Sequence, residues 1–408
     1  MGFCGGKGLA IAWECLPEKP KFMNIVHLGK YYPPAPGGIE SHVQTLARGQ
    51  SELGHELRVI CVNHTDKQGN DVTHFRWRKT SSFTHVDGKV RVDRIGRWFS
   101  ISRLEVCPNL TGWISDATSK ADIVHLHTPN PLMLAAWWVA GNRKTALVVT
   151  HHSDVIKQRF LRRLLDPFES RVYGAAKLIF SDSPNYIEGS LVLQKFRQKV
   201  VVLPLGIDLE PYLNPGVTEQ EETKRIKGNY GWPLWLMVGR MTYYKGYHVA
   251  LEALAKTPGK LLVVGNGPLE GDLKRQAANL GVAERVVWMP SVSQSQLISL
   301  YHAATALWFP SVARSEGFGL AQVEAMACGC PVINTAIPAS GVSWVSLHGE
   351  SGLTGPMGDP EALSKASRRI TGENGLRETL SKGAKKRAVE NFNASKMALT
   401  SLELYQSR

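Results

Sequence analysis

The sequence is poor in the features that mark several classes of protein. No apolar run reaches the roughly 18 residues that a membrane-spanning helix requires. Its six cysteines are scattered without the spacing of a disulfide framework or a zinc site, and we expect the closely spaced Cys328 and Cys330 to be packed side chains. The first 22 residues lack the basic, apolar and cleavage-site succession of a signal peptide. We therefore expect a cytoplasmic protein, with residues 1–22 forming a poorly ordered extension or reflecting a misassigned start.

Acidic residues are scarce relative to basic ones. The chain has 35 Asp and Glu against 48 Lys and Arg, a formal net charge of +13. We find no zinc finger, no aromatic and basic strand of the RNA-binding kind and no basic recognition helix, so nucleic acid is not the expected partner. An anionic membrane face or anionic phosphate substrates explain the charge better.

One segment carries much of this basic character next to apolar residues. Residues 154–179 interleave leucines, isoleucines and phenylalanine with lysines and arginines. The pattern is typical of an amphipathic helix that lies on an anionic membrane, although a solvated basic face over an ordinary core stripe would look the same. We expect peripheral attachment to the inner face of the plasma membrane.

The length and the alternation of elements predict two domains. A chain of 408 residues is too long for one ordinary core. Short strand-like runs alternate with helical periods, as in parallel βαβ units, and the rhythm restarts after a polar, turn-rich connection over residues 212–231. We predict two Rossmann-like α/β domains facing each other across a cleft, with a terminal helix. The expected units are residues 23–209, 210–390 and 391–408.

Glycine-rich turns follow several of the predicted strands. The GxGxxG dinucleotide fingerprint is absent from the first of them, which argues against a dehydrogenase. Gly37 and Gly38 nevertheless open a helix, where free backbone N–H groups suit a phosphate or a sugar. Gly265 and Gly267 form a second strand-to-helix turn without the full pattern.

Two cations follow the strand that ends at Gly239. Arg240 and Lys245 suit a diphosphate, the first as a planar fork and the second as a point charge, although a solvated basic loop is an alternative. Such a clamp stabilises charge on a departing nucleoside diphosphate. No Asp-x-Asp metal site is evident, so we predict no metal requirement and no cofactor.

Two carboxylates and several histidines complete the candidate site. Glu316 lies in a turn between glycines, and Glu324 lies eight positions later in a helix-favouring run. His127 is expected in a loop at a strand end. His151, His152 and Ser153 follow another strand. Adjacent histidines of an extended chain point to opposite sides, which makes an acceptor contact a better interpretation of this pair than a metal site.

These pieces, taken together, resemble the retaining glycosyltransferases of the GT-B fold, family four in particular. The resemblance runs from about residue 23 to residue 405 and rests on the order and spacing of its motifs. The motifs are Gly37-Gly38-Ile39-Glu40, His125-Leu126-His127, Leu203-Pro204-Leu205-Gly206-Ile207-Asp208, Val238-Gly239-Arg240, Lys245-Gly246, Val264-Gly265-Asn266-Gly267-Pro268 and the segment from Glu316 to Glu324.

The resemblance implies roles for individual residues. Arg240 and Lys245 would bind the donor diphosphate, and His127 would contact the sugar or the reacting centre. Glu316 would bind the sugar hydroxyls and Glu324 the ribose. Donor-pocket residues would further include Gly37, Gly38, Gly239, Gly265, Gly267, Ser291 in the loop 289–293, Phe318, Gly319 and Leu320.

The resulting expectation is a retaining hexosyltransferase that uses a nucleotide-diphosphate sugar. The likeness to bacterial enzymes of polysaccharide assembly favours GDP-mannose as donor and a glycan or polyprenyl-linked acceptor, with a UDP-sugar donor nearly as well supported. A sugar-nucleotide epimerase of the same fold and an inactive nucleotide-binding protein remain alternatives. We do not favour a glycosidase, because neither carboxylate has an evident catalytic partner and the two cations would have no role.

Overall fold

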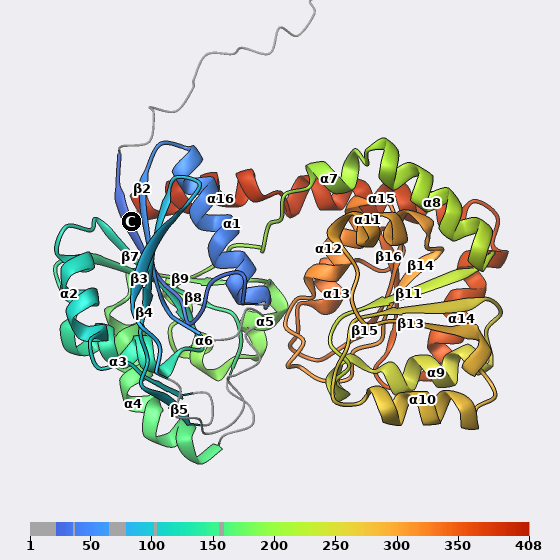
Figure 1. The fold of residues 1–408 in the computed structure, drawn as a ribbon, viewed down its shortest axis with the longest axis horizontal. Helices are drawn as coiled ribbons and strands as arrows, with labels where there is room; N and C mark the ends of the chain where they lie inside the picture. Colours follow the sequence, from blue (N-terminus) through green and yellow to red (C-terminus); the bar gives the residue numbers. More distant parts are fainter. Residues whose placement is uncertain (1–21, 36, 65–78, 102–103, 155–158, 408) are drawn as a thin grey trace, which may run out of the picture.

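The chain folds around two mainly parallel β-sheets, built in turn from its N-terminal and C-terminal halves (Figure 1). The computed structural model describes residues 22–35, 37–64, 79–101, 104–154 and 159–407, so most of the expected N-terminal extension lies outside the described residues. This arrangement confirms the prediction of two Rossmann-like α/β domains.

The N-terminal sheet has eight strands in the order β10-β9-β8-β7-β1-β2-β4-β3. Its central strand β7 is buried along its whole length and β1 at all but its first residue, as expected where helices cover both faces of a parallel sheet. The strands are β1 (Asn24–Leu28), β2 (Glu56–Val62), β3 (Phe83–Asp87), β4 (Val90–Ile95), β7 (Ile123–Thr128), β8 (Ala146–His151), β9 (Leu178–Ser181) and β10 (Val200–Val202).

Sequence patterning did not predict the edge of this sheet. Strand β3 pairs antiparallel with β4 and is mostly exposed, so it carries no apolar run that would reveal it. A second hairpin, β5 (Phe99–Ile101) with β6 (Leu104–Val106), follows. The helices of this half are α1 (Gly38–Glu52), α2 (Leu110–Ser119), α3 (Pro131–Ala140), α4 (Arg159–Ala175), α5 (Pro184–Gly189) and α6 (Leu191–Lys195).

The C-terminal sheet has six parallel strands in the order β13-β12-β11-β14-β15-β16. Trp235 and Trp308, on neighbouring strands, stack with ring centroids 5.2 Å apart within its core. The strands are β11 (Leu234–Val238), β12 (Lys260–Val264), β13 (Val286–Met289), β14 (Ala306–Phe309), β15 (Val332–Ala336) and β16 (Gly352–Pro356). The helices are α9 (Tyr247–Ala255), α10 (Glu270–Asn279), α11 (Gln294–Ala303), α12 (Leu320–Ala327), α13 (Val342–Val345), α14 (Pro360–Gly372) and α15 (Leu376–Asn391).

The expected turn-rich connection over residues 212–231 is wrong. This stretch forms most of α7 (Glu210–Leu213) and α8 (Val217–Tyr230), and α8 packs along α11. Ile226 is the only residue of α8 that is fully buried, so the helix presents no apolar stripe wide enough for its period to be detected. Polar contacts hold it instead, among them a 2.6 Å hydrogen bond from Ser295 to Glu219.

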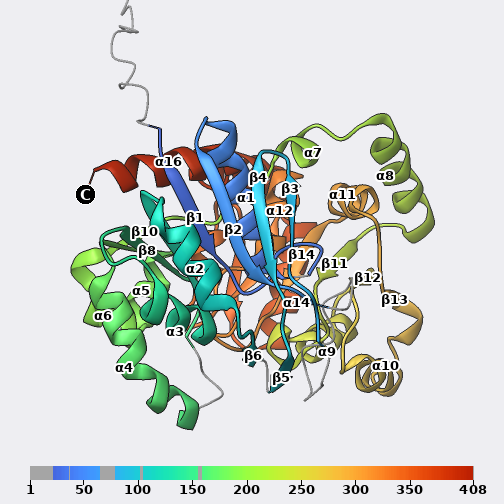
Figure 2. The same cartoon turned by 60° about the vertical axis from the view of Figure 1, so that its left-hand side comes forward.

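The terminal helix α16 (Ala394–Gln406) returns to the N-terminal half and lies against α1, as both views show (Figures 1 and 2). Buried hydrogen bonds fix it there. Gln50 donates to Ser401 over 2.8 Å, and the Tyr405 hydroxyl meets the His125 ring at 2.7 Å. None of the described helices is both long and apolar enough to cross a lipid bilayer.

Candidate active site

A buried ion pair marks the C-terminal side of the site. Lys245, in the 3-10 turn after β11, places its Nζ 2.6 Å from a carboxylate oxygen of Glu316. The ammonium also lies 5.0 Å from the centre of the Phe309 ring. Burial alone would lower the pKa of Lys245, but the adjacent Glu316 carboxylate raises it above its ordinary value. Lys245 therefore remains a cation inside a largely desolvated site.

The loops at the carboxyl ends of β11 and β12 pack against each other through glycine. Gly265 has φ 128°, and a Cβ there would collide with the carbonyl oxygen of Gly239. A Cβ on Gly267 would lie 2.5 Å from the carbonyl oxygen of Met241. These glycines thus fix the loop that carries Arg240, whose side chain is exposed. Ser291, in the next loop along this edge, is also exposed.

Glu324 and the glycines before it shape the start of α12. Gly319 adopts a left-handed φ of 83° at the helix N-cap, which lets the loop from Glu316 enter the helix. Phe318 is buried and Leu320 half-buried. Glu324 accepts a 2.7 Å hydrogen bond from the Tyr301 hydroxyl, and burial raises its pKa. Neither glutamate is a solvated surface residue.

The N-terminus of α1 approaches α12 from the other domain. A Cβ on Gly38 would lie 3.9 Å from the Leu320 side chain, so the starts of the two helices converge. The carboxylate of Glu40 folds back toward Gly37, close enough that a Cβ on Gly37 would collide with it. Burial raises the pKa of Glu40. The sequence analysis includes Glu40 in the motif Gly37-Gly38-Ile39-Glu40 but gives its side chain no role.

Histidines form the N-terminal side of the site. His127 lies within β7 and not in a loop after it, because the strand continues to Thr128; that expectation was wrong. The His127 ring meets His27 at 3.0 Å through Nε2 and His152 at 3.3 Å through Nδ1. Burial lowers the pKa of His27 to about 4 and that of His127 well below its ordinary value. Both rings are therefore neutral at physiological pH.

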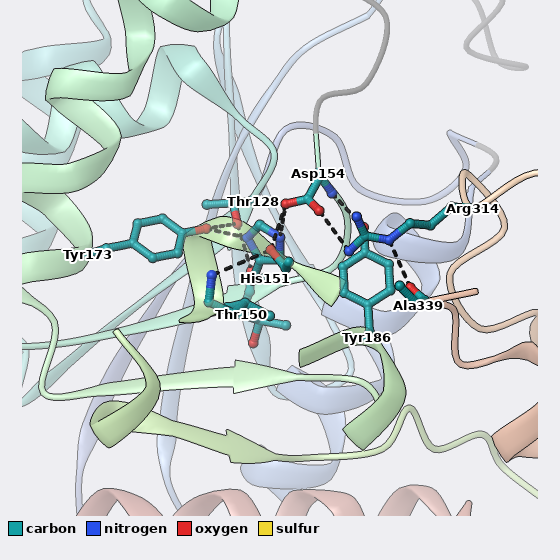
Figure 3. Close-up of polar contacts among 10 residues, drawn as sticks. Thr128, Thr150, His151, Asp154, Tyr173, Tyr186, Arg314 and Ala339 are labelled. Atoms are coloured by element: carbon teal, nitrogen blue, oxygen red, sulfur yellow. Dashed lines mark hydrogen bonds and ion pairs between the residues drawn. The ribbon is translucent and has the colours of Figure 1, made fainter. Parts of the chain in front are cut away.

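The pair His151 and His152 points in opposite directions, as the alternation of an extended chain requires. His151 contacts the Tyr173 hydroxyl at 2.6 Å and Asp154 at 3.1 Å (Figure 3). His152 faces His127, with Asp182 at 3.5 Å from its Nδ1. Ser153 follows in the same loop and is half-buried.

A further histidine, His42, joins this cluster from α1. Its ring lies 5.6 Å from that of His127 and 5.0 Å from that of His152, centroid to centroid. Two groups of three buried histidines could geometrically hold a metal ion: His27, His125 and His127, and His42, His127 and His152. The sequence did not reveal His42, because a single histidine on an amphipathic helix carries no motif.

Arg314 and Asp154 join the two domains beside the site. Their side chains form a 2.9 Å ion pair, and the guanidinium lies 4.6 Å from the Tyr186 ring centre (Figure 3). Arg314 also donates a 2.8 Å hydrogen bond to the carbonyl of Ala339, and the Tyr186 hydroxyl accepts one from the Asp154 backbone. The sequence analysis gave neither residue a role in the site, although Arg314 lies two residues before Glu316 and Asp154 directly follows the His-His-Ser stretch.

Comparison with known proteins agrees with this architecture. The model of the family described as Glycosyltransferase Family 4 matches residues 36–211, and that of Glycosyl transferases group 1 matches residues 219–387. The chain is 35% identical to D-rhamnosyltransferase WbpZ of Pseudomonas aeruginosa, covering 91% of this chain and 93% of the relative. It is 27% identical to O-antigen chain mannosyltransferase C of Escherichia coli, covering 94% and 98%.

A solved structure shares the fold. Sucrose-phosphate synthase from Thermosynechococcus elongatus superposes with a TM-score of 0.72 at 22% identity, covering 94% of this chain and 98% of that chain. Fold, family models and full-length relatives thus point the same way. The chain belongs to the group 1 and family 4 glycosyltransferases, and the cleft between its two Rossmann-like domains is that of a glycosyltransferase of the GT-B fold.

Proposed function

We propose that the protein is a retaining hexosyltransferase that transfers a sugar from a nucleotide diphosphate to a glycan or lipid-linked acceptor. The observation that carries this proposal is the Lys245–Glu316 ion pair beside Gly317, where a Cβ would lie 3.4 Å from the carbonyl oxygen of His152 in the other domain. The names of the two full-length relatives, a rhamnosyltransferase and an O-antigen mannosyltransferase, support polysaccharide or glycolipid synthesis and favour mannose, with GDP-mannose as donor.

The donor side of the site would bind the nucleotide sugar mainly through charged groups. Lys245 and Arg240 would hold the diphosphate, and Glu316 would accept hydrogen bonds from sugar hydroxyls. Glu324, with one oxygen already bonded to Tyr301, would use the other toward the ribose. Two cations next to the leaving group stabilise the negative charge that develops there, so the transfer itself would need no metal.

The chemical step would proceed on one face of the sugar. The bond from the anomeric carbon to the phosphate oxygen breaks, and a bond from that carbon to the acceptor oxygen forms on the same side. The acceptor proton passes to a phosphate oxygen of the departing nucleoside diphosphate. No protein nucleophile is required, which fits a site whose carboxylates are engaged with Lys245 and Tyr301.

The acceptor side would act through neutral hydrogen-bonding groups. His127 would lie near the reacting centre, with His152 and Ser153 toward the acceptor. His151 was also predicted to contact the acceptor, but both its ring nitrogens already have partners. We therefore assign it to holding Asp154, and through Asp154 the link to Arg314.

A lipid-linked acceptor would require contact with a membrane surface. The basic and apolar segment 154–179 and the net charge of +13 support peripheral binding to the anionic inner face of the plasma membrane. Helix α4 covers Arg159–Ala175 of this segment, while residues 155–158 lie outside the described residues.

A transfer assay tests the proposal. Purified protein in EDTA is incubated with GDP-mannose or UDP-glucose and a polyprenyl-linked saccharide, and the product is analysed by mass spectrometry and by NMR of the new anomeric centre. We expect acceptor-dependent transfer with retained configuration, and none with Glu316→Ala. Conversion of the sugar nucleotide without acceptor would instead show an epimerase. Nucleotide binding without turnover of any donor would show an inactive binding protein.

A further inference from the structure

The two groups of three buried histidines differ in how their ring nitrogens are satisfied. In the group of His27, His125 and His127, the hydrogen bonds form a closed network. His27 bonds to His127 and to Gln50 at 2.8 Å, and His125 bonds to Thr150 at 2.6 Å and to Tyr405 at 2.7 Å. This group is explained as a buried hydrogen-bond network that needs no ion.

The second group contains a histidine that the protein leaves unsatisfied. His42 is 2% exposed, and among the described residues neither of its ring nitrogens has a hydrogen-bond partner. Burying a polar group without a partner is unfavourable, and native proteins rarely do so without a reason. His42 lies against His127 and His152, whose rings stack at an interplanar angle of 13°. The vacant nitrogens therefore belong to a cluster of three imidazoles.

The geometry of this cluster is close to that of a zinc site. One ligand nitrogen from each of the three side chains lies within 4.8 Å of the others, and His127 Nδ1 and His152 Nε2 are 3.3 Å apart. A tetrahedral Zn²⁺ with bonds of about 2.0–2.1 Å holds its nitrogen ligands about 3.3 Å apart. Zinc binding would require the third nitrogen, from His42, to come to about that distance from the other two.

The surroundings have the second layer of contacts that metal-bound histidines require. Ligating histidines usually direct their other ring nitrogen to a carboxylate, a carbonyl or another fixed partner, which sets the ring orientation. Asp182 lies 3.5 Å from His152 Nδ1, and His27 holds His127 Nε2.

We propose that His42, His127 and His152 form a binding site for a divalent transition metal, with Zn²⁺ the best match to three imidazole ligands. One of the four zinc positions is left for an oxygen ligand. The site is separate from the cationic clamp at Arg240 and Lys245. If the proposed transfer takes place at this site, a metal here would remove His127 and His152 from acceptor binding, so Zn²⁺ inhibits the transfer and is not needed for it.

Direct binding tests this inference without reference to activity. Tag-free, chelator-treated protein is titrated with ZnCl₂ in competition with a chromophoric chelator, and its thermal unfolding is followed with and without the metal. We expect one equivalent bound and a higher unfolding temperature with Zn²⁺. His42→Leu and His152→Asn should each weaken binding at least 100-fold, and Asp182→Asn about 10- to 100-fold. His248→Leu, which removes a histidine of α9 outside the cluster, should bind as wild type does.

The result for His42→Leu decides the matter. If the imidazole exists to bind metal, its removal should leave the metal-free protein at least as stable as wild type, because no hydrogen bond is lost. It should also remove the zinc-dependent rise in unfolding temperature. Equal zinc affinity in wild type and His42→Leu would overturn the proposal, as would the absence of stoichiometric binding in the wild type.

A second measurement separates failure of this inference from failure of the proposed function. Nucleoside diphosphate affinity is measured on the same samples, since the proposed clamp of Arg240 and Lys245 lies in the C-terminal domain, and it should be unchanged by His42→Leu. If the transfer assay succeeds, micromolar Zn²⁺ should inhibit wild type and spare His42→Leu. Equal inhibition of both by Zn²⁺ would place the metal elsewhere and contradict the site.

Discussion

The two walls of the site present different chemical groups. The C-terminal wall presents full charges, with Lys245 and Glu316 paired and Arg240 exposed beside them. The N-terminal wall presents imidazoles that burial keeps neutral, connected through His127. A charged wall suits a diphosphate and a neutral wall suits sugar hydroxyls. In the proposed function, the charged wall would therefore hold the donor diphosphate and the histidines would contact the acceptor.

The largest loss of activity is expected when a cation of the charged wall is removed. Lys245→Ala and Arg240→Ala should each lower kcat/KM by about 100- to 1,000-fold, because each removes a cation that stabilises the departing diphosphate. Steady-state kinetics with saturating acceptor measure this, with circular dichroism as a check that the fold is intact. Lys260→Ala, which removes a half-buried lysine at the start of β12, provides a control at a position outside the proposed clamp. Near-normal rates for both clamp variants would contradict the assignment.

A smaller effect is expected from the neutral wall. His127→Gln should lower kcat/KM for the acceptor by about 10- to 100-fold, since it removes one positioned hydrogen-bonding group near the reacting centre. Donor affinity, measured by calorimetry, should be unchanged. A variant that loses donor affinity as strongly as Lys245→Ala would show that the walls do not divide their roles as described.

Loss of the ion pair between Asp154 and Arg314, which links the two walls, should lower kcat/KM less than the changes described above. Asp154→Asn and Arg314→Ala should each reduce kcat/KM by up to about 10-fold, and the double variant should be little worse than either, because the two remove one shared ion pair. A double-mutant cycle measures the coupling. Strictly additive losses would show that the pair does not hold the domains together in solution.

The same link predicts a pH dependence of stability. Burial alone would raise the pKa of Asp154, but hydrogen bonds from His151 and Ser190 and the charge of Arg314 lower it below 3.8. A depressed folded-state pKa contributes stability above the unfolded value, and this is lost as the pH falls below about 3.8. The difference in unfolding free energy between wild type and Asp154→Asn should therefore be constant near neutrality and shrink in acid. A difference that grows in acid would contradict the ion pair.

The smallest effect on catalysis is expected from substitutions in the segment proposed to bind the membrane. Replacing Lys157, Arg159, Arg162 and Arg163 by glutamine should release the protein from anionic vesicles, since each basic residue near such a surface contributes about 1 kcal/mol. Turnover with a water-soluble acceptor should change less than twofold. Unchanged sedimentation with the vesicles would remove the membrane assignment.

How far the sequence predicts the site also differs between the walls. The charged wall comes from short local segments, so Arg240, Lys245, Glu316 and Glu324 could be picked out individually. The pairing of Lys245 with Glu316 could not be predicted, because only the folded arrangement of neighbouring strands brings the two residues together. The neutral wall collects single residues from α1, β1, β7 and the end of β8, and His42 has no sequence signal of its own.

Prediction of the secondary structure from the sequence is limited in the same way. Buried parallel strands were predicted because their apolar runs are continuous, as in β11. The edge strand β3 and helix α8 were missed because both bury little apolar surface and are held by partners distant in sequence. Long-range pairing, and not local pattern, determines such elements.

The most direct test of the central claim is the binding of nucleoside diphosphates in the absence of metal. Wild type and Lys245→Ala are titrated with GDP, UDP and ADP by calorimetry in EDTA. The account predicts selective binding of one diphosphate by wild type and a loss of at least 10-fold in the variant, with the corresponding nucleoside monophosphate far less affected. Tight binding that survives Lys245→Ala, or no binding of any diphosphate without a divalent metal, would contradict the cationic clamp.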